Sequence, residues 1–287
     1  MVAPPRAPGP ATTTHRHGRL DVTLERRGPA TVVAAQDIVF PSGTVRIADV
    51  DGDGVGELQI TNPSGGLLAG DRMDTLLRAR AGTRASVVTQ GANRVCGAAV
   101  GLPPARTELH ARMALEGDAV LEWAPHHLVP YARAAILQRT AVEVAPAAGL
   151  LLWETLSAGR SGRGERFAWD HVDVRMRVAR DGRPLLHDGA VLGPGGEPFD
   201  GADLVATVVV VLPTDRPAGT ATDLADDLHR ALGAVPGTLA SASAVDDALI
   251  VGRVVARDAT VLYRALHAAR VLARPALGLP APRRPIT

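Results

Sequence analysis

Three glutamates and one arginine lie in or beside the most apolar stretches of the chain: Glu122, Glu154, Glu165 and Arg160. Glu122 belongs to the pattern AVLEW and Glu154 to LLWET, both typical of buried strands. Because an isolated carboxylate is very costly to bury, each charge must be paired or wet. Three arrangements meet this condition: a structural ion-pair network, a pair of glycosidase-type carboxylates, or a polar internal passage for a cation. Spacing alone does not rank them.

An acidic segment resembles half of a calcium loop. Asp49, Asp51 and Asp53 precede Gly54, as in the first half of an EF-hand. The twelfth position of that loop requires a bidentate glutamate, but here it is Ile60, and no helix pattern flanks the segment. We therefore expect an acidic, glycine-rich hairpin loop. A calcium-dependent adhesion module is an alternative that rests on this loop alone and requires export.

Two further segments carry residues that could bind a ligand. Residues 62–72 read NPSGGLLAGDR, without the spacing of a P-loop or a dinucleotide fingerprint, so we expect tight turns that end at Asp71. His126 and His127 are adjacent, so on an extended strand they point to opposite faces and cannot both bind one ion. We expect them at the surface, with one pointing inward beside Glu122 as the alternative.

The elements that position these residues are mostly strands. Apolar and polar residues alternate in many segments, and the clearest case runs from His171 to Leu186. Its Asp181-Gly182 dipeptide is typical of a tight turn, which predicts a hairpin with one wet face. Continuous apolar runs at 150–153 and 205–212 predict strands that are buried on both faces.

Helical periodicity appears only near the end of the chain. Residues 223–232 carry leucines on one stripe, with Thr222 as the expected N-cap. Residues 259–273 form a second amphipathic pattern, with Asp258 as N-cap and Arg274-Pro275 at its end. The sequence thus predicts a mainly β fold with about two α-helices near the C-terminus.

The composition excludes several classes of protein. The 287 residues carry 31 basic and 30 acidic side chains, so the charge argues against a protein that coats nucleic acid. The longest apolar run, 204–213, is well short of the roughly 20 residues that span a bilayer. The single Cys96 cannot form an internal disulfide, and no export signal is evident, so we expect a cytoplasmic protein. Residues 1–18 are predicted to be a disordered leader before a single domain at 19–287.

Four motifs, in this order, resemble the urease accessory protein family UreD, also called UreH. They are NPSGGLLAGD at 62–71, VTQGANRV at 88–95, LEWAPHHLVPYARA at 121–134 and LLWETLSAGRSGRGERF at 151–167. The RDGRPLL hairpin at 180–186 and the final helix leading to ARPALGLP agree with the same family. The resemblance extends from about Gly18 to Pro285. Where the family usually has LPQE, this chain has APHH, which includes the two adjacent histidines.

This resemblance implies a fold, partners and a role. Family members adopt a β-rich, helix-like stack of strands with a couple of helices, here expected as a flattened two-sheet body, and they are not enzymes. They act as chaperones and scaffolds that bind apo-urease and recruit UreF and, through it, the nickel-carrying GTPase UreG. No cofactor is expected to stay bound, because Ni²⁺ passes transiently.

The resemblance also gives the embedded carboxylates a use, because the family guides Ni²⁺ through an internal water-filled passage. A conduit should offer sparse oxygen ligands that do not trap the ion. We expect transient ligands and supporting residues at Glu122, Glu154, Glu165 and Asp71, with Arg160 as counter-ion and His126 near the mouth. Two alternatives stay open: these residues only hold the strands in register, or two of the three glutamates serve a β-solenoid glycoside hydrolase. Carboxylates in an enclosed tunnel favour the passage, whereas carboxylates in an open groove favour hydrolysis.

Overall fold

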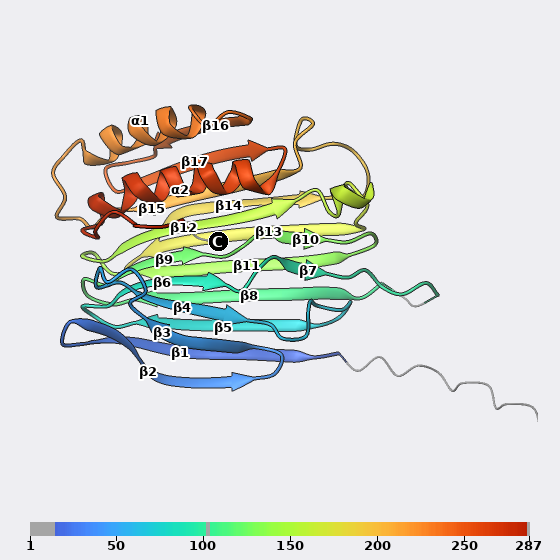
Figure 1. Cartoon of the computed structure of the whole chain (residues 1–287), viewed down its shortest axis with the longest axis horizontal. Helices are drawn as coiled ribbons and strands as arrows, with labels where there is room; N and C mark the ends of the chain where they lie inside the picture. Colours follow the sequence, from blue (N-terminus) through green and yellow to red (C-terminus); the bar gives the residue numbers. More distant parts are fainter. Residues whose placement is uncertain (1–14, 102–103, 286–287) are drawn as a thin grey trace, which may run out of the picture.

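The computed structural model describes residues 15–101 and 104–285, in which the strands form two β-sheets in one stack (Figure 1). The first sheet has the spatial order β14 (Arg183–Leu192), β13 (His171–Arg180), β11 (Ala135–Val144), β8 (Arg106–Leu115), β5 (Arg72–Ala79), β1 (His17–Arg27) and β2 (Ala30–Val39). The second sheet has the order β16 (Thr238–Ala244), β17 (Leu249–Ala256), β15 (Leu204–Val211), β12 (Gly149–Ser157), β9 (Val120–Ala124), β6 (Arg84–Thr89), β4 (Gly56–Thr61) and β3 (Gly43–Ala48). Two short strands join this sheet beside β12: β10 (Leu128–Pro130) pairs with β12, and β7 (Asn93–Val95) pairs with β10.

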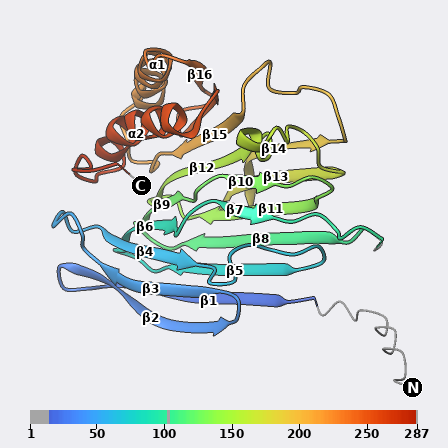
Figure 2. The same cartoon turned by 45° about the vertical axis from the view of Figure 1, so that its right-hand side comes forward.

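The chain builds the stack by passing back and forth between the sheets. In the first sheet β5, β8, β11 and β13 are successive parallel neighbours, and in the second sheet β4, β6, β9 and β12 are. Each passage adds one strand to each sheet, so the strands rise in a helix-like order (Figures 1 and 2). Antiparallel strands close both ends of each sheet. The prediction of a β-rich, helix-like, two-sheet body is confirmed.

The predicted hairpin and buried strands are also confirmed. β13 and β14 pair antiparallel, and Asp181 and Gly182 both have positive φ angles, 49° and 74°, as a type I′ turn requires. The apolar runs form β12 and β15, which are neighbours in the second sheet. Both strands are buried on two faces because the first sheet covers one side and the helices cover the other.

Two α-helices lie at one end of the stack, against the second sheet (Figure 1). They are α1 (Thr220–Gly233) and α2 (Ala259–Ala276), and a single 3₁₀ turn, η1 (Ser161–Arg163), precedes them in the chain. Asp258 caps α2 as expected, because its carboxylate accepts a hydrogen bond of 2.8 Å from the backbone N–H of Val261.

Two predicted helix ends were wrong. Thr222 is not the N-cap of α1, because Gly219 adopts a φ of 87° and turns the chain into the helix at Thr220. Likewise α2 does not stop before Arg274-Pro275 but continues to Ala276. A proline in the last turn removes only one backbone donor, and the N–H of Leu277 still bonds to the carbonyls of Ala273 and Arg274.

The core consists of three apolar clusters. One lies between the second sheet and the helices and includes Trp153, Leu228 and Leu266. The other two lie between the sheets, one around Leu121 and Leu152, the other around aromatic and aliphatic residues that include Phe167, Trp169 and Ile136. Among the described residues, neither helix is both long enough and apolar enough to cross a bilayer.

The first strand begins inside the segment that was predicted to be a leader, residues 1–18. Residues 1–14 lie outside the described residues. β1 begins at His17, inside the predicted leader, because the ring of His17 bonds to Asp74 and the guanidinium of Arg16 bonds to Asp71.

Candidate functional site

A cavity of about 590 Å³ lies between the two sheets, in the middle of the stack. Its walls come from β4, β6, β9 and β12 on one side, from β5, β8 and β11 on the other, and from the segments 62–67 and 90–94. At this level the first sheet places small side chains inward, with Thr75 on β5, Ala111 on β8 and Thr140 on β11 in register. The space exists because these three strands place no large apolar side chain in this row.

Glu154 projects into this space from β12. The hydroxyl of Thr140, on the facing sheet, donates a hydrogen bond to Glu154 Oε1. The carboxyl group borders the cavity, and the residue is partly buried between the sheets. Burial therefore raises the pKa of Glu154 to about 7, hydrogen bonds from Thr140 and Gln138 oppose this change, and the charge of Asp188 adds to it. Near neutral pH the group can exchange its proton for a cation.

This raised pKa predicts how stability depends on pH. The folded state keeps a proton on Glu154 up to pH about 7, whereas the unfolded chain loses it near the ordinary value of 4.5. The folded state is therefore progressively destabilised as pH rises from 4.5 through 7. Replacing Glu154 with glutamine removes this titration, so the variant should gain up to about 3 kcal/mol over the wild type at pH 8.

Urea denaturation of both proteins at pH 5 and pH 8 measures this difference. All other carboxyl groups are shared by the two proteins, so their effects cancel in the comparison. Equal stabilities at pH 8 would show that Glu154 is not buried as described.

His126 borders the same cavity, in the turn between β9 and β10. Its backbone N–H donates to the hydroxyl oxygen of Thr89 at 2.9 Å, and its ring Nδ1 lies 3.2 Å from the same oxygen. Burial lowers the pKa of His126, so its imidazole is neutral at pH 7 and can accept a cation. The ring Nδ1 of His127 lies 3.0 Å from the hydroxyl of Tyr263 on α2. The two histidines lie in a turn and not on an extended strand, and both rings lie against Tyr263, with ring centroids 5.5 and 6.0 Å from that of Tyr263, so the prediction that they point to opposite faces is wrong.

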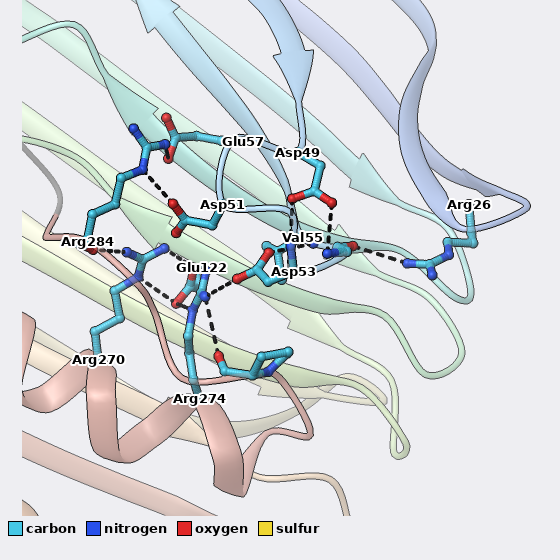
Figure 3. A network of polar contacts seen from close by, with 12 residues as sticks. Arg26, Asp49, Asp51, Asp53, Val55, Glu57, Glu122, Arg270, Arg274 and Arg284 are labelled. Carbon is cyan, nitrogen blue, oxygen red and sulfur yellow. Dashed lines mark hydrogen bonds and ion pairs between the residues drawn. The ribbon is translucent and has the colours of Figure 1, made fainter.

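Glu122, unlike Glu154, is held by two arginines (Figure 3). It is fully buried on the face of β9 that α2 covers, and both carboxylate oxygens accept hydrogen bonds of 2.8 to 3.0 Å from Arg270 and Arg274. Burial alone would raise the pKa of Glu122, but the bonds from Arg274 and Arg270 outweigh it and hold the pKa below its usual value. This carboxylate is part of an ion-pair network and does not border the cavity.

The acidic loop between β3 and β4 completes this network. Asp53 accepts a bond of 2.7 Å from Arg274, and Asp51 accepts one of 2.6 Å from Arg284 in the C-terminal segment (Figure 3). Asp49 instead binds the backbone N–H groups of Asp53 and Gly54, at 3.0 and 2.9 Å. The predicted acidic hairpin loop is confirmed, and its carboxylates bind arginines and backbone amides.

Asp71 and Glu165 are also held by arginines. Asp71 is buried and accepts bonds from the backbone N–H groups of Arg16 and Leu68 and from the side chain of Arg16. Burial alone would raise its pKa, but these bonds lower it below its usual value. Glu165 is paired with Arg160, whose guanidinium carbon lies 4.3 Å from the centre of the Tyr131 ring. Neither carboxylate borders the cavity.

The structure therefore brings together only two of the six residues expected from the sequence. Glu154 and His126 border the cavity, whereas Glu122, Asp71, Glu165 and Arg160 belong to separate ion pairs. Hydrolysis of a glycoside requires two carboxyl groups on either side of one bond. Only one of the three candidate glutamates borders the cavity, so this arrangement does not supply the pair.

The sequence patterns did not single out three further polar residues, which continue from Glu154 across the neighbouring strands. On β15, Thr207 is the register partner of Glu154, and on β17, Arg253 is the register partner of Thr207. Asp188, on the edge strand β14, pairs with Arg253. The signal was available, because Thr207 and Arg253 each interrupt a valine-rich strand.

Comparison with known proteins adds the family. The model of the UreD urease accessory protein family matches residues 16–287. The chain belongs to the UreD family. The match covers nearly all of the described chain, including both sheets, the cavity and the two C-terminal helices.

Three relatives span most of the chain. The urease accessory protein UreD of Pseudomonas fluorescens (strain Pf0-1) is 28% identical over 243 residues, which cover 82% of this chain and 85% of that protein. The urease accessory protein UreD 2 of Streptomyces griseus subsp. griseus is 32% identical over 228 residues, covering 75% of this chain and 74% of that protein. The UreD protein of Ruegeria pomeroyi is 29% identical over 241 residues, covering 81% and 89%.

Proposed function

We propose that this chain is a urease maturation factor that has no turnover of its own. In this role it bridges apo-urease to UreF and, through UreF, to the GTPase UreG, and Ni²⁺ travels through the cavity between the two sheets. Membership of the UreD family supports the maturation role. The observation that supports the nickel route is the space between the two sheets that Glu154 and His126 both border.

The ligands at this cavity suit a cation that must move on. Ni²⁺ binds imidazole and thiolate sites tightly, so a site with several such ligands would retain it. Here one carboxyl group and one neutral imidazole are joined by weak ligands such as the hydroxyl of Thr140 and the side-chain amide of Asn93. Because Glu154 is partly protonated near pH 7, the ion must also displace a proton to bind, which keeps its affinity low.

Exposed apolar side chains support the scaffold role. Phe40 is 63% exposed at the end of β2, and Leu239 is 70% exposed on the edge strand β16. Large apolar side chains at sheet edges are a liability in an isolated protein and are often covered by partners. We therefore expect poor solubility of the isolated chain and rescue on co-expression with UreF. A freely soluble monomer that is indifferent to UreF would count against the scaffold role.

The maturation role is tested by deleting the gene and measuring urease activity per unit of urease protein. We expect urease in normal amount, but inactive and poor in nickel, with activity restored by the intact gene. Full activity without the gene would overturn the proposed role.

A further inference from the structure

A row of polar side chains extends beyond the cavity. On the second sheet, Glu154, Thr207 and Arg253 are register partners on three successive strands, β12, β15 and β17. Neighbouring strands lie about 4.8 Å apart, so Arg253 is about 10 Å beyond Glu154 in the direction of the helical end of the stack. All three side chains point into the space between the sheets, because residues in register share one face.

The first sheet carries a matching row. Thr140, Met176 and Asp188 are register partners on β11, β13 and β14, and β14 is the last strand of that sheet. Thr140 therefore lies opposite Glu154, and Asp188 lies opposite Arg253, one row of each sheet facing the other.

The last pair of residues in these rows closes the gap between the sheets. The guanidinium of Arg253 forms an ion pair with Asp188 and donates a hydrogen bond of 2.5 Å to the hydroxyl of Thr207. The side chains of Arg253 and Asp188 are 47% and 21% exposed, so they face solvent. The cavity reaches Glu154 and Thr140 but none of these three residues, which together with the buried Met176 lie between it and solvent at this end.

We propose that the ion pair between Arg253 and Asp188 is a gate at this end of the cavity. The inference rests on the proposed passage of a divalent cation. With the gate closed, the guanidinium repels a cation that approaches from Glu154, and Asp188 is neutralised. With Arg253 turned into solvent, Asp188 becomes a free carboxylate ligand two strands beyond Glu154, so the same movement removes the barrier and supplies the next ligand.

The energetics of this ion pair suit a gate. A solvent-facing ion pair contributes only about 0 to 1 kcal/mol, so a docked partner or an arriving cation can open it at small cost. Opening requires changes of rotamer in the half-exposed Arg253 and in the flexible Met176 beside it, with no movement of the strands. By contrast, the ion pairs of Glu122 are fully buried and cannot open without unpacking α2.

The gate is tested by exchanging Arg253 in the purified complex of the chain with UreF, nickel-loaded UreG and apo-urease. Arg253→Gln removes the charge, and Arg253→Lys keeps it. Arg230→Gln, which breaks the exposed ion pair with Asp227 on α1, is the matched control. Each complex is mixed with an excess of chelator, and the nickel captured by the chelator and by urease is measured over time.

We expect Arg253→Gln to lose nickel to the chelator about fivefold faster than the wild type, because a charge repulsion across about 10 Å is removed. Arg253→Lys and Arg230→Gln should behave as the wild type, and all three variants should keep the wild-type melting temperature.

Glu154→Gln is measured in the same assay. If it slows delivery to urease while Arg253→Gln behaves as the wild type, the gate is wrong and the passage stands. If neither variant changes delivery or capture, the passage itself is wrong.

Discussion

Replacing Glu122 with alanine is expected to destabilise the fold by about 3 to 5 kcal/mol, because it leaves two buried guanidinium groups without their shared partner. Arg270 and Arg274 are almost fully buried, and four of their hydrogen bonds end on this one carboxylate. The loss also frees α2 from β9, since the network is the polar link between them (Figure 3). Urea denaturation of the purified chain, co-expressed with UreF if necessary, measures the change.

Glu116→Ala is the control for this substitution. Glu116 is half-exposed and pairs with Arg78 at 3.5 Å on the surface of the first sheet, so its loss should cost less than about 1 kcal/mol. If Glu122→Ala does not fold, Glu122→Gln, which keeps the shape and half of the acceptors, should fold with an intermediate loss. A loss below about 1 kcal/mol for Glu122→Ala, combined with failure to activate urease, would return Glu122 to the nickel route.

Filling the cavity is expected to have the largest effect on function. Ala111→Trp places an indole ring in the row between Thr75 and Thr140, at the position that has the smallest side chain of the three. An apolar constriction forces a hydrated dication to lose water without gaining ligands, so urease activity per urease protein should fall about tenfold or more. The fold should tolerate the change because the ring enters empty space instead of a packed core.

Ala114→Trp controls for the effect of bulk on β8. Ala114 lies on the same strand but alternates with the buried Met113 and Leu115, so its side chain points to the outer face of the first sheet. Urease activity with this variant should match the wild type. Equal losses with both tryptophan variants would attribute the effect to β8 as a whole, and no loss with Ala111→Trp would exclude the cavity as the nickel route.

Local patterns predicted most of the fold. The Asp181-Gly182 turn, the cap at Asp258 and the two valine-rich and leucine-rich strands depend on neighbouring residues, so they could be read without knowing the stack. The prediction of Thr222 as N-cap of α1 was wrong because Gly219, which has no side chain to mark a cap, holds that position instead. The helix-like stacking of the strands was expected from the family resemblance and not from any local pattern, and the order of the strands was not predicted.

The site was harder to predict because its contacts join distant parts of the chain. The buried partners of Glu122 lie 148 and 152 residues away, on α2. One signal was present: Arg270 and Arg274 are one helical turn apart on the apolar stripe of that helix, where two arginines require a buried anion. Glu122 and Glu154 have similar apolar neighbours in sequence, so only the register and the covering layer separate a structural carboxylate from one that borders the cavity.

Nickel content is the measurement that tests the passage most directly. Complexes of UreF and nickel-loaded UreG with the wild-type chain, Ala111→Trp or Ala114→Trp are purified and mixed with apo-urease. The nickel bound per urease active site is then determined after a fixed time in buffer that contains a chelator. We expect full loading with the wild type and Ala114→Trp and little nickel with Ala111→Trp, although all three complexes assemble equally. Equal loading by all three complexes would contradict a route through the cavity.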